Sequence, residues 1–551
     1  MSSAEPSPVR VRRLPLTGVL RIGRPSDIWF KPALSVVVAV GVPNLTLLAL
    51  GRLDLALYTM AGSLCALYAH HLPYAARGRA LAWVVLGMLA SVATALVTAS
   101  LTSSAVILVC VGALLAAAQK ALCDATRIGP PGPVIFTFIS SASLFAPQTL
   151  GQVPGHLALG AAAGAWAWLV GMAPGLVRPH GPERRATARA LYAAAAYVEA
   201  SPTGPADGHE RARAAAAAAV HAAWQPLLAA GSRPEPRRSL ERLVVRAEIA
   251  LAAPGDTDPA RLRSWARDLR GTKPVPRLAP GPAADELLGV EIELAAGQAR
   301  PTSRLRPLLP LALRTALGCA LAGHVSLALG VGRPYWALVT AASLYQTNIT
   351  LTWSRGVQRV VGNLVGVLLF AAVAPLAHLG PAALVLCCLA FNFGAEALIS
   401  RNYWLGSICV TPMALLITEF TGFQEPGGLM TDRLVDTLVG AFVGFAAAVA
   451  VTNRRAGDRI EDALDTADHA RAHAERLIAA ERPGPAALES ARRRLAAALV
   501  ELRATADAAA GEWWQRALPE ERVMLAEQAG HRTLAATVRR QGPHLLEGTR
   551  A

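Results

Sequence analysis

The feature that most constrains the fold is a series of long apolar stretches that occur in two groups. A bilayer core is about 30 Å thick, so a helix that crosses it needs roughly 20 consecutive apolar residues. Scanning the 551 residues on this basis predicts twelve spanning helices. They lie at about 33–50, 55–72, 80–101, 103–119, 133–148 and 155–177, and at about 308–332, 335–352, 360–377, 381–399, 403–419 and 434–451. We therefore expect an all-α polytopic membrane protein built as two six-helix transmembrane halves.

The composition supports lipid rather than nucleic acid as the partner. Hydrophobic residues make up 53% of the chain and charged residues only 17%, which is low for a soluble protein. The net charge of +15 raises the alternative of nucleic-acid binding, but only Lys31, Lys120 and Lys273 are lysines. The arginines do not alternate with aromatic rings, as single-strand binding would require. We expect a bilayer and no nucleic acid.

The basic residues fall in alternate loops between the predicted spans, which sets the expected orientation. Cytosolic loops of membrane proteins carry the excess of arginine and lysine. The bases expected inside are Arg77, Arg79, Lys120, Arg127, Arg178, Arg184, Arg185, Arg355, Arg359, Arg401, Arg454, Arg455 and Arg459. Those expected outside are Arg52, Arg333 and Arg433. This pattern predicts a protein of the cytoplasmic membrane with both termini in the cytosol.

Five regions follow from the spans and the charges. We expect a basic cytosolic segment (1–32), a first membrane half (33–178), a cytosolic helical region (179–304), a second membrane half (305–453) and a cytosolic helical tail (454–551). Helical hairpins are predicted in the two cytosolic regions, because stretches rich in Ala, Arg, Glu and Leu alternate with Pro/Gly segments. These amphipathic stretches are 185–200, 238–252, 284–297, 457–480 and 485–510.

The two membrane halves resemble each other weakly. The sequence ALYT at 56–59 corresponds to ALVT at 337–340, and Arg77-Gly78 corresponds to Arg355-Gly356. Six spans per half would give both copies one orientation, so the expected arrangement is a parallel pseudo-repeat of the kind common in transporters. Chance similarity between Ala/Leu-rich helices is the alternative.

One stretch, YWALVTAASLYQTNITLTWSRGVQRVVGNLVG at 335–366, combines apolar helices with a polar face. Arg355, Arg359 and Asn363 are four residues apart, so they share one face of a helix. Gly362 and Gly366 form a GxxxG pattern, which lets a second helix approach closely. The arginines either orient the span only or form a guanidinium pair that draws a carboxylate into the membrane. The residues alone leave both interpretations open.

This stretch, with its neighbours, resembles the fusaric acid resistance family of aromatic acid exporters. The similarity covers about 305–453 and includes LPLALRTALGCALA, YWALVT, R-G-x-x-R-x-x-G-x-x-x-G, RNYWLGSICVTPMALLITE and DRLVDTLVGAFVG. The family usually has Thr where this chain has Asn363, and the N-terminal copy lacks the later glycines. The resemblance implies efflux of aromatic or hydrophobic carboxylic acids, driven by the proton gradient. It implies substrate contacts at Arg314, Arg355, Arg359 and Asn363.

Ionisable residues inside the predicted spans are the other functional candidates, because charge at membrane depth is costly. His324, Glu396 and Asp436 are the candidates for proton coupling, and Glu419 lies at the end of a span. Arg433 lies three residues before Asp436, so a structural ion pair is an equal alternative. His324 is also compatible with a hydrogen bond between helices. Gln346, Asn348, Asn392 and Thr411 either line a polar route or join helices.

The sequence thus favours a secondary transporter of small organic anions. A membrane-anchored scaffold or sensor that acts through its cytosolic helices is the alternative. An enzyme ranks below both, because no HExxH or GxSxG motif occurs. No metal or cofactor is expected, since Cys/His ligand spacing is absent and GxxxxGK[ST] does not occur. The oligomeric state, including a homo-oligomer, stays open.

Overall fold

The computed structural model describes residues 14–23, 29–126, 128–200, 206–229, 235–252, 254–271, 273–276, 305–346, 348–451, 456–480, 484–510 and 520–547. Helices dominate these ranges, and no strand occurs within them. The prediction of an all-α polytopic membrane protein is therefore confirmed. The helix predicted at 284–297 lies outside the described residues.

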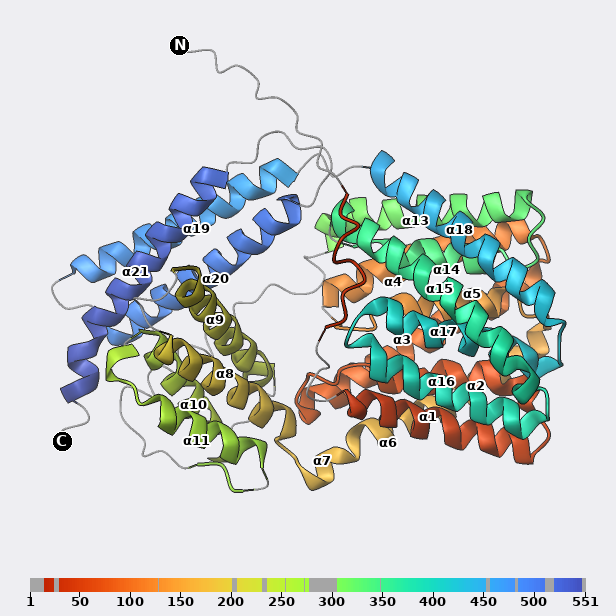
Figure 1. Cartoon of the computed structure of the whole chain (residues 1–551), viewed down its shortest axis with the longest axis horizontal. Helices are drawn as coiled ribbons and strands as arrows, with labels where there is room; N and C mark the ends of the chain where they lie inside the picture. Colours follow the sequence, from red (N-terminus) through yellow and green to blue (C-terminus); the bar gives the residue numbers. More distant parts are fainter. Residues whose placement is uncertain are drawn as a thin grey trace, which may run out of the picture.

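The first group of apolar helices occupies the red-to-yellow part of Figure 1. Its elements are α1 (Phe30–Ala49), η1 (Leu53–Leu55), α2 (Ala56–Ser63), η2 (Leu64–Leu67), α3 (Tyr74–Leu101), α4 (Ala105–Thr126), α5 (Val134–Leu144), η3 (Leu150–Gln152), α6 (Val153–Met172) and α7 (Pro174–Val177). The second group follows in green to blue. It contains α13 (Leu305–Ala328), α14 (Tyr335–Leu344), α15 (Ile349–Ala377), α16 (Pro381–Ile399), α17 (Tyr403–Thr418), η6 (Glu419–Thr421) and α18 (Pro426–Ala450).

Nine apolar helices in the described part of the chain are long enough to cross a bilayer. Three shorter apolar segments, Leu53–Leu67, Val134–Leu144 and Tyr335–Leu344, stand where the second, fifth and eighth spans were predicted. At about 1.5 Å per residue, the ten residues of α14 cover only about half of a bilayer core. The division into six plus six spanning helices is therefore not confirmed, although each predicted apolar stretch contains a helix.

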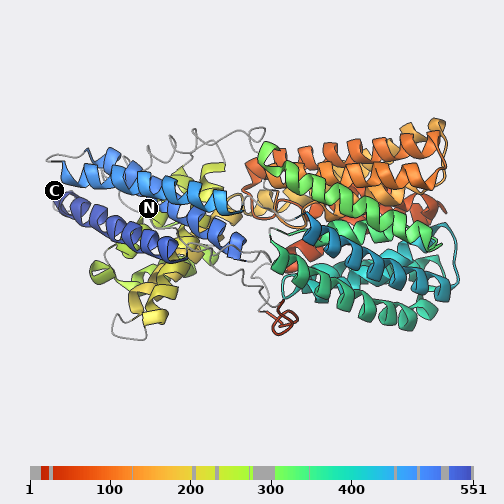
Figure 2. The same ribbon diagram turned by 90° about the horizontal axis from the view of Figure 1, so that it is seen from above.

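The two groups repeat one packing scheme. The short helix α2 packs on α6, and the short helix α14 packs on α18. In each case a glycine allows the close contact. A Cβ at Gly62 of α2 would lie 2.1 Å from the backbone oxygen of Gly160 on α6, and a Cβ at Gly440 of α18 would lie 2.4 Å from that of Ala337 on α14. Between the groups, α1 packs on α16 and α13 packs on α4, which is a reciprocal exchange. Figure 2 shows the two groups side by side.

Two further helical regions lie together at one end of the apolar bundle (Figures 1 and 2). The first contains α8 (Gly181–Glu199), α9 (Ala206–Ala229), α10 (Glu235–Ala252), η4 (Pro254–Asp256) and α11 (Pro259–Arg270). The second contains α19 (Ala456–Ala479), α20 (Pro485–Ala510) and α21 (Glu520–Glu547). Each has its own apolar core. Because both regions lie at the same end, they would lie on the same side of a membrane.

Candidate functional site

The helix α14 lies wholly inside the protein. All ten of its residues are buried, which suits its uniformly apolar and aromatic sequence. The sequence analysis predicted one span over 335–352, but the chain leaves the helix at Tyr345, and Asn348 begins the next one. The side chain of Asn348 accepts a hydrogen bond from the backbone N–H of Leu351 at 2.8 Å, which caps α15. Arg355 and Arg359 therefore belong to α15 and not to a loop.

Two arginines of α15 meet one tyrosine at the start of α17. The guanidinium carbon of Arg355 lies 3.9 Å from the centre of the Tyr403 ring. One helical turn further on, Nη1 of Arg359 donates to the Tyr403 hydroxyl at 3.0 Å. Arg355 is half-buried, and Arg359 is only 4% exposed. The spacing of four residues thus places both guanidinium groups around one aromatic ring.

Asn363, one turn further along α15, connects these two arginines to a third arginine, Arg433. Its Nδ2 donates to the backbone oxygen of Arg359 at 3.0 Å. Its Oδ1 accepts from Oγ1 of Thr411 at 2.7 Å and from Nε of Arg433 at 3.2 Å. Arg433 is 1% exposed, although the sequence analysis placed it in an outer loop. The reason for the difference is that α18 begins at Pro426, so Arg433 lies inside the helix.

Beyond Arg433 the polar face reaches the buried indole of Trp336 on α14. The guanidinium carbon of Arg433 lies 5.1 Å from the Trp336 ring centre, and that of Arg333 lies 5.2 Å from it. Guanidinium groups at such distances from an aromatic face are attracted by its electrons. Four arginines of the second membrane half are thus connected through two aromatic rings and Asn363. We call this set the arginine ladder; its members are Arg355, Tyr403, Arg359, Asn363, Arg433, Trp336 and Arg333.

The buried part of the arginine ladder carries excess positive charge. Among the described residues, neither Arg359 nor Arg433 forms an ion pair, and Nε of Arg359 and Nη1 of Arg433 have no hydrogen-bond partner. Asp436 lies one turn from Arg433 on α18 but accepts instead from the hydroxyl of Ser326. Two buried guanidinium groups thus stand near one carboxylate, that of Asp436, whose charge interacts with Arg433, and buried charge that is not compensated is strongly unfavourable. The arrangement is therefore suited to hold an anion.

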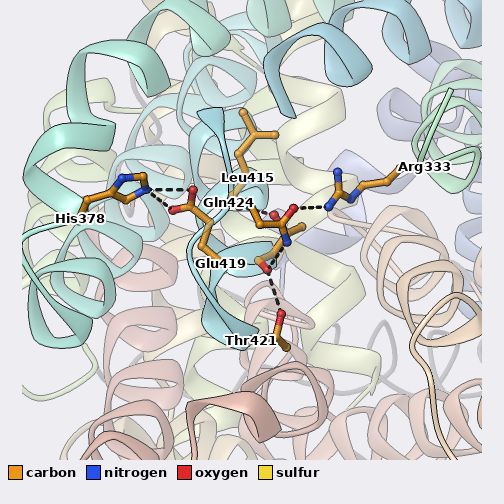
Figure 3. A network of polar contacts seen from close by, with 7 residues as sticks. Arg333, His378, Leu415, Glu419, Thr421 and Gln424 are labelled. Carbon is orange, nitrogen blue, oxygen red and sulfur yellow. Dashed lines mark hydrogen bonds and ion pairs between the residues drawn. The ribbon is translucent and has the colours of Figure 1, made fainter. Parts of the chain in front are cut away.

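The far end of the arginine ladder, away from the additional helical regions, is fixed by polar contacts (Figure 3). Arg333 donates to the Gln424 side chain and lies 3.6 Å from Asp432. Nearby, Nε2 of His378 lies 3.1 Å from the buried carboxylate of Glu419. Glu419, which the sequence analysis placed at the end of a span, thus has a local partner and does not contact the ladder arginines.

The near end of the arginine ladder is covered by residues 14–23, here called the N-terminal strap. Gln358 and Asn402 donate to the backbone oxygen of Val19 at 2.9 and 3.1 Å. The indoles of Trp353 and Trp404 donate to backbone oxygens of the strap at 3.2 Å. Because these side chains flank Arg355, Arg359 and Tyr403 in sequence, the strap lies across the entrance to the ladder.

Three of the predicted site residues lie elsewhere. Arg314 donates from Nε and Nη2 to the backbone oxygen of Val451 at 3.1 and 2.7 Å, so it caps the end of α18. His324 contacts the backbone oxygen of Ala320 at 2.7 Å and Cys110 of α4 at 3.9 Å. Glu396 is half-buried on α16 and contacts no member of the ladder among the described residues. The structure brings together Arg355, Arg359 and Asn363, with Asp436 next to Arg433.

Gly362 and Gly366 face α17. A Cβ at Gly362 would lie 2.5 Å from Cβ of Ser407, and one at Gly366 would lie 2.6 Å from Cβ of Thr411. Real Cβ atoms do not approach this closely, so α15 and α17 could not keep their separation with any larger residue. This close approach lets Thr411 reach Asn363, and so it positions the centre of the ladder.

The segment that holds the arginine ladder is similar to a known family. Residues 319–447 match the family described as fusaric acid resistance protein-like, which confirms the resemblance seen in the sequence. An uncharacterized membrane protein YvaC of Bacillus subtilis (strain 168) is 32% identical over 158 residues, 28% of this chain and 25% of that protein. An uncharacterized protein of Haemophilus influenzae is 31% identical over 145 residues, 26% of this chain and 19% of that protein. No solved structure gives a significant match.

These similarities cover part of each protein. The alignments span a quarter or less of the length of the two relatives and little more than a quarter of this chain, so they do not describe the whole protein. Together with the apolar helices, they define a multi-pass helical membrane protein with a fusaric acid resistance-like segment.

Proposed function

We propose that this protein is a secondary transporter that exports aromatic or hydrophobic carboxylates across the cytoplasmic membrane, with the arginine ladder as the anion pathway. The proposal rests on one observation about two buried arginines, Arg359 and Arg433. Each has a guanidinium nitrogen without a hydrogen-bond partner, and neither forms an ion pair among the described residues. A carboxylate would supply the missing negative charge and would accept hydrogen bonds from a guanidinium fork.

The aromatic members of the ladder favour a substrate with a flat apolar body. Tyr403 and Trp336 stand next to Arg359 and Arg433, so a ring attached to a bound carboxylate would meet an aromatic surface. A small inorganic anion would gain nothing from these rings. We therefore assign aromatic and hydrophobic carboxylates, and not inorganic anions, as the substrate class.

The two short helices support a transport role for the whole membrane bundle. In transporters built from repeats, interrupted helices at corresponding positions of the two halves mark the substrate site. Here α2 and α14 are such a pair, and each packs on the last long helix of its own group. The ladder begins at the end of α14, where the helix is interrupted.

Asp436 is the proton-coupling group in this proposal. It is fully buried, its Oδ2 has no hydrogen-bond partner among the described residues, and it lies one turn from Arg433. Protonation would leave Arg433 as an uncompensated cation, whereas ionisation would offset its charge. The substrate anion and the carboxylate of Asp436 would thus compete for the guanidinium group of Arg433.

Transport into proteoliposomes tests the proposal. The purified protein is reconstituted, and the accumulation of radiolabelled 2-naphthoate is compared with that of the neutral 2-naphthamide and of chloride, with and without a proton gradient. We expect transport of the acid only, and faster transport with the gradient. Equal permeation in protein-free and protein-containing vesicles would contradict a transport function, and transport of chloride at the same rate would contradict the substrate class.

A further inference from the structure

A pocket lined by five arginines lies where the first membrane half joins the additional helices. It encloses about 280 Å³ between α7, α8 and α11. Its walls are Arg178, Gly181, Arg184, Arg185, Arg189, Leu269, Arg270 and Gly271. No acidic side chain of the described part of the chain lines it.

One wall of the pocket is held rigidly. Arg184 donates to the backbone oxygens of Asp268, Leu269, Gly271 and Lys273, at distances between 2.6 and 3.3 Å. Asp268 and Leu269 lie in the last turn of α11, whose carbonyl groups have no partners inside their own helix, and Gly271 and Lys273 directly follow it. Arg184 therefore joins α8 to α11 and fixes the width of the pocket, and Arg178 and Arg185 stand on the opposite side of it toward the membrane helices.

The positive charge of the pocket extends to the membrane helices. Arg178 and Arg185 lie close enough to Lys31, at the start of α1, for their charges to interact, and Arg185 also interacts with Arg77 at the start of α3. Burial is the main cause that lowers the pKa of Arg185; the charges of Arg189 and Arg178 lower it further, and Tyr74 and Glu183 offset part of this shift. Like charges gathered in a partly buried site repel one another unless an anion is present.

The position of the pocket indicates which anion. The apolar segment Leu150–Val177 ends one residue before Arg178, so the pocket lies at the level of the lipid headgroups. Guanidinium forks match the oxygen geometry of phosphate groups, and basic pockets at the ends of membrane helices bind anionic headgroups. The N-terminal end of α8, at Gly181, adds a further partial positive charge.

We infer that this pocket is a binding site for a phosphate ester, supplied by the headgroup of an anionic phospholipid or by a soluble phosphate-bearing molecule. The inference does not depend on the proposed transport function. It assigns a role to α8 and α11, which otherwise only adjoin the membrane bundle. An occupied pocket would tie these helices to the membrane surface through Arg178 and Arg185.

The test is a titration of the unfolding temperature of the detergent-solubilised full-length protein. The probes are short-chain phosphatidylglycerol, phosphatidylcholine of the same chain length, and glycerol 3-phosphate. The variants are Arg178→Gln/Arg185→Gln and, as a matched control, Arg79→Gln, which removes an exposed arginine at the same end of the bundle. Arg178→Lys/Arg185→Lys keeps the charge, should the first variant fail to fold.

We expect phosphatidylglycerol, but not phosphatidylcholine, to raise the unfolding temperature of the parent and of Arg79→Gln. The concentration for half the effect should rise at least ten-fold in the pocket variants. An equal effect of glycerol 3-phosphate would identify a soluble phosphate ester as the occupant, whereas its lack of effect would identify the lipid headgroup. If the lipids act alike, or if Arg79→Gln weakens the response as much as the pocket variants, the arginines only orient the protein and the inference is wrong.

Discussion

At the scale of single residues, the proposed anion site of the second membrane half depends on a few buried side chains. The side-chain amide of Asn363 contacts both Arg359 and Arg433. Its Nδ2 donates to the backbone oxygen of Arg359, and its Oδ1 accepts from Nε of Arg433. Both guanidinium groups keep a donor nitrogen that no described residue uses. Charge-assisted hydrogen bonds contribute about 1.5–3 kcal/mol each, so a carboxylate at this point would gain substantial binding energy.

Replacement of both α15 arginines by lysine separates charge from shape. Arg355→Lys/Arg359→Lys keeps the charges that orient the span, but it loses the planar contact with the Tyr403 ring and the forked donors. We expect normal insertion and normal amounts of protein, together with an apparent KM for export of an aromatic acid at least ten-fold higher than that of the parent. Arg401→Lys, an exposed arginine at the same end, is the control. If the double variant exports the acid as well as the parent does, these arginines only orient the span in the membrane.

At this scale the sequence predicted only part of the site. The four-residue spacing identified Arg355, Arg359 and Asn363, because helical periodicity shows a shared face without any structure. Arg433 and Trp336 were missed as partners, since a hydropathy scan ends a span at a charge and cannot show that an arginine is buried. A repeated sequence pattern, R-x-Y-W, could have identified the two aromatic members of the ladder, Trp336 and Tyr403. It occurs at Arg333–Trp336 and Arg401–Trp404, at the starts of α14 and α17.

Helices of this protein approach one another through glycine, and the contact between α15 and α17 has consequences for the site. We expect Gly366→Ala to reduce the yield and the unfolding temperature of the protein, because its Cβ would lie 2.6 Å from Thr411 and 2.9 Å from the backbone oxygen of Ile408. Gly356→Ala, on the same helix, meets only Leu344 at 3.9 Å. That control should fold as well as the parent, since alanine favours helix by about 1 kcal/mol over glycine. Equal behaviour of the two variants would show that α17 is not packed against this face.

The helices outside the membrane bundle are joined by one buried carboxylate. Glu248 of α10 accepts from Trp224 at 2.8 Å and from Arg492 of α20 at 3.1 Å, and Arg493 lies 3.4 Å away. Burial alone would raise the pKa of Glu248, but the charges of Arg493 and Arg492 and the hydrogen bond from Trp224 lower it below its ordinary value. The ionised carboxylate therefore stabilises the contact between α10 and α20.

This lowered pKa predicts how stability depends on pH. A carboxyl group with a depressed pKa stabilises the folded state above its unfolded pKa of about 4.3, and this contribution is lost as the pH falls through the folded pKa. We expect Glu248→Gln to unfold at a lower temperature than the parent at pH 7, and the difference to close below about pH 4. Thermal unfolding followed by circular dichroism measures it. A difference that persists unchanged at low pH would mean that the charge of Glu248 does not hold the helices together.

At the scale of elements, apolar periodicity predicted where helices occur and failed at their ends. All twelve apolar stretches contain helix, but three helices are too short to span. Hydropathy registers α2 and α14 as spans because burial inside protein selects the same apolar residues as burial in lipid. The start of the helix that follows α14 depends on a local polar contact, the cap of α15 by Asn348, which an apolar average does not detect.

The whole molecule combines a repeated membrane bundle with helical regions at one end. The packing of α1 on α16 and of α13 on α4 is reciprocal, and the pseudo-repeat expected from the weak sequence similarity stays a prediction. The arginine ladder is confined to the second half, whereas the arginine pocket adjoins the first. The corresponding arginine of the first half, Arg77, is buried but donates to His70 and is not part of a ladder. The two halves thus share a fold and differ in their sites.

Equilibrium binding of radiolabelled 2-naphthoate to the purified protein tests the central claim, that the buried arginines of the ladder bind an organic anion. The parent, Arg433→Gln and the exposed control Arg401→Gln are compared in detergent at constant salt. We predict saturable binding to the parent and to Arg401→Gln, with a Kd at least ten-fold higher for Arg433→Gln, because one charged donor is lost. The same Kd for all three proteins would contradict the account, since the anion would then bind away from the arginine ladder.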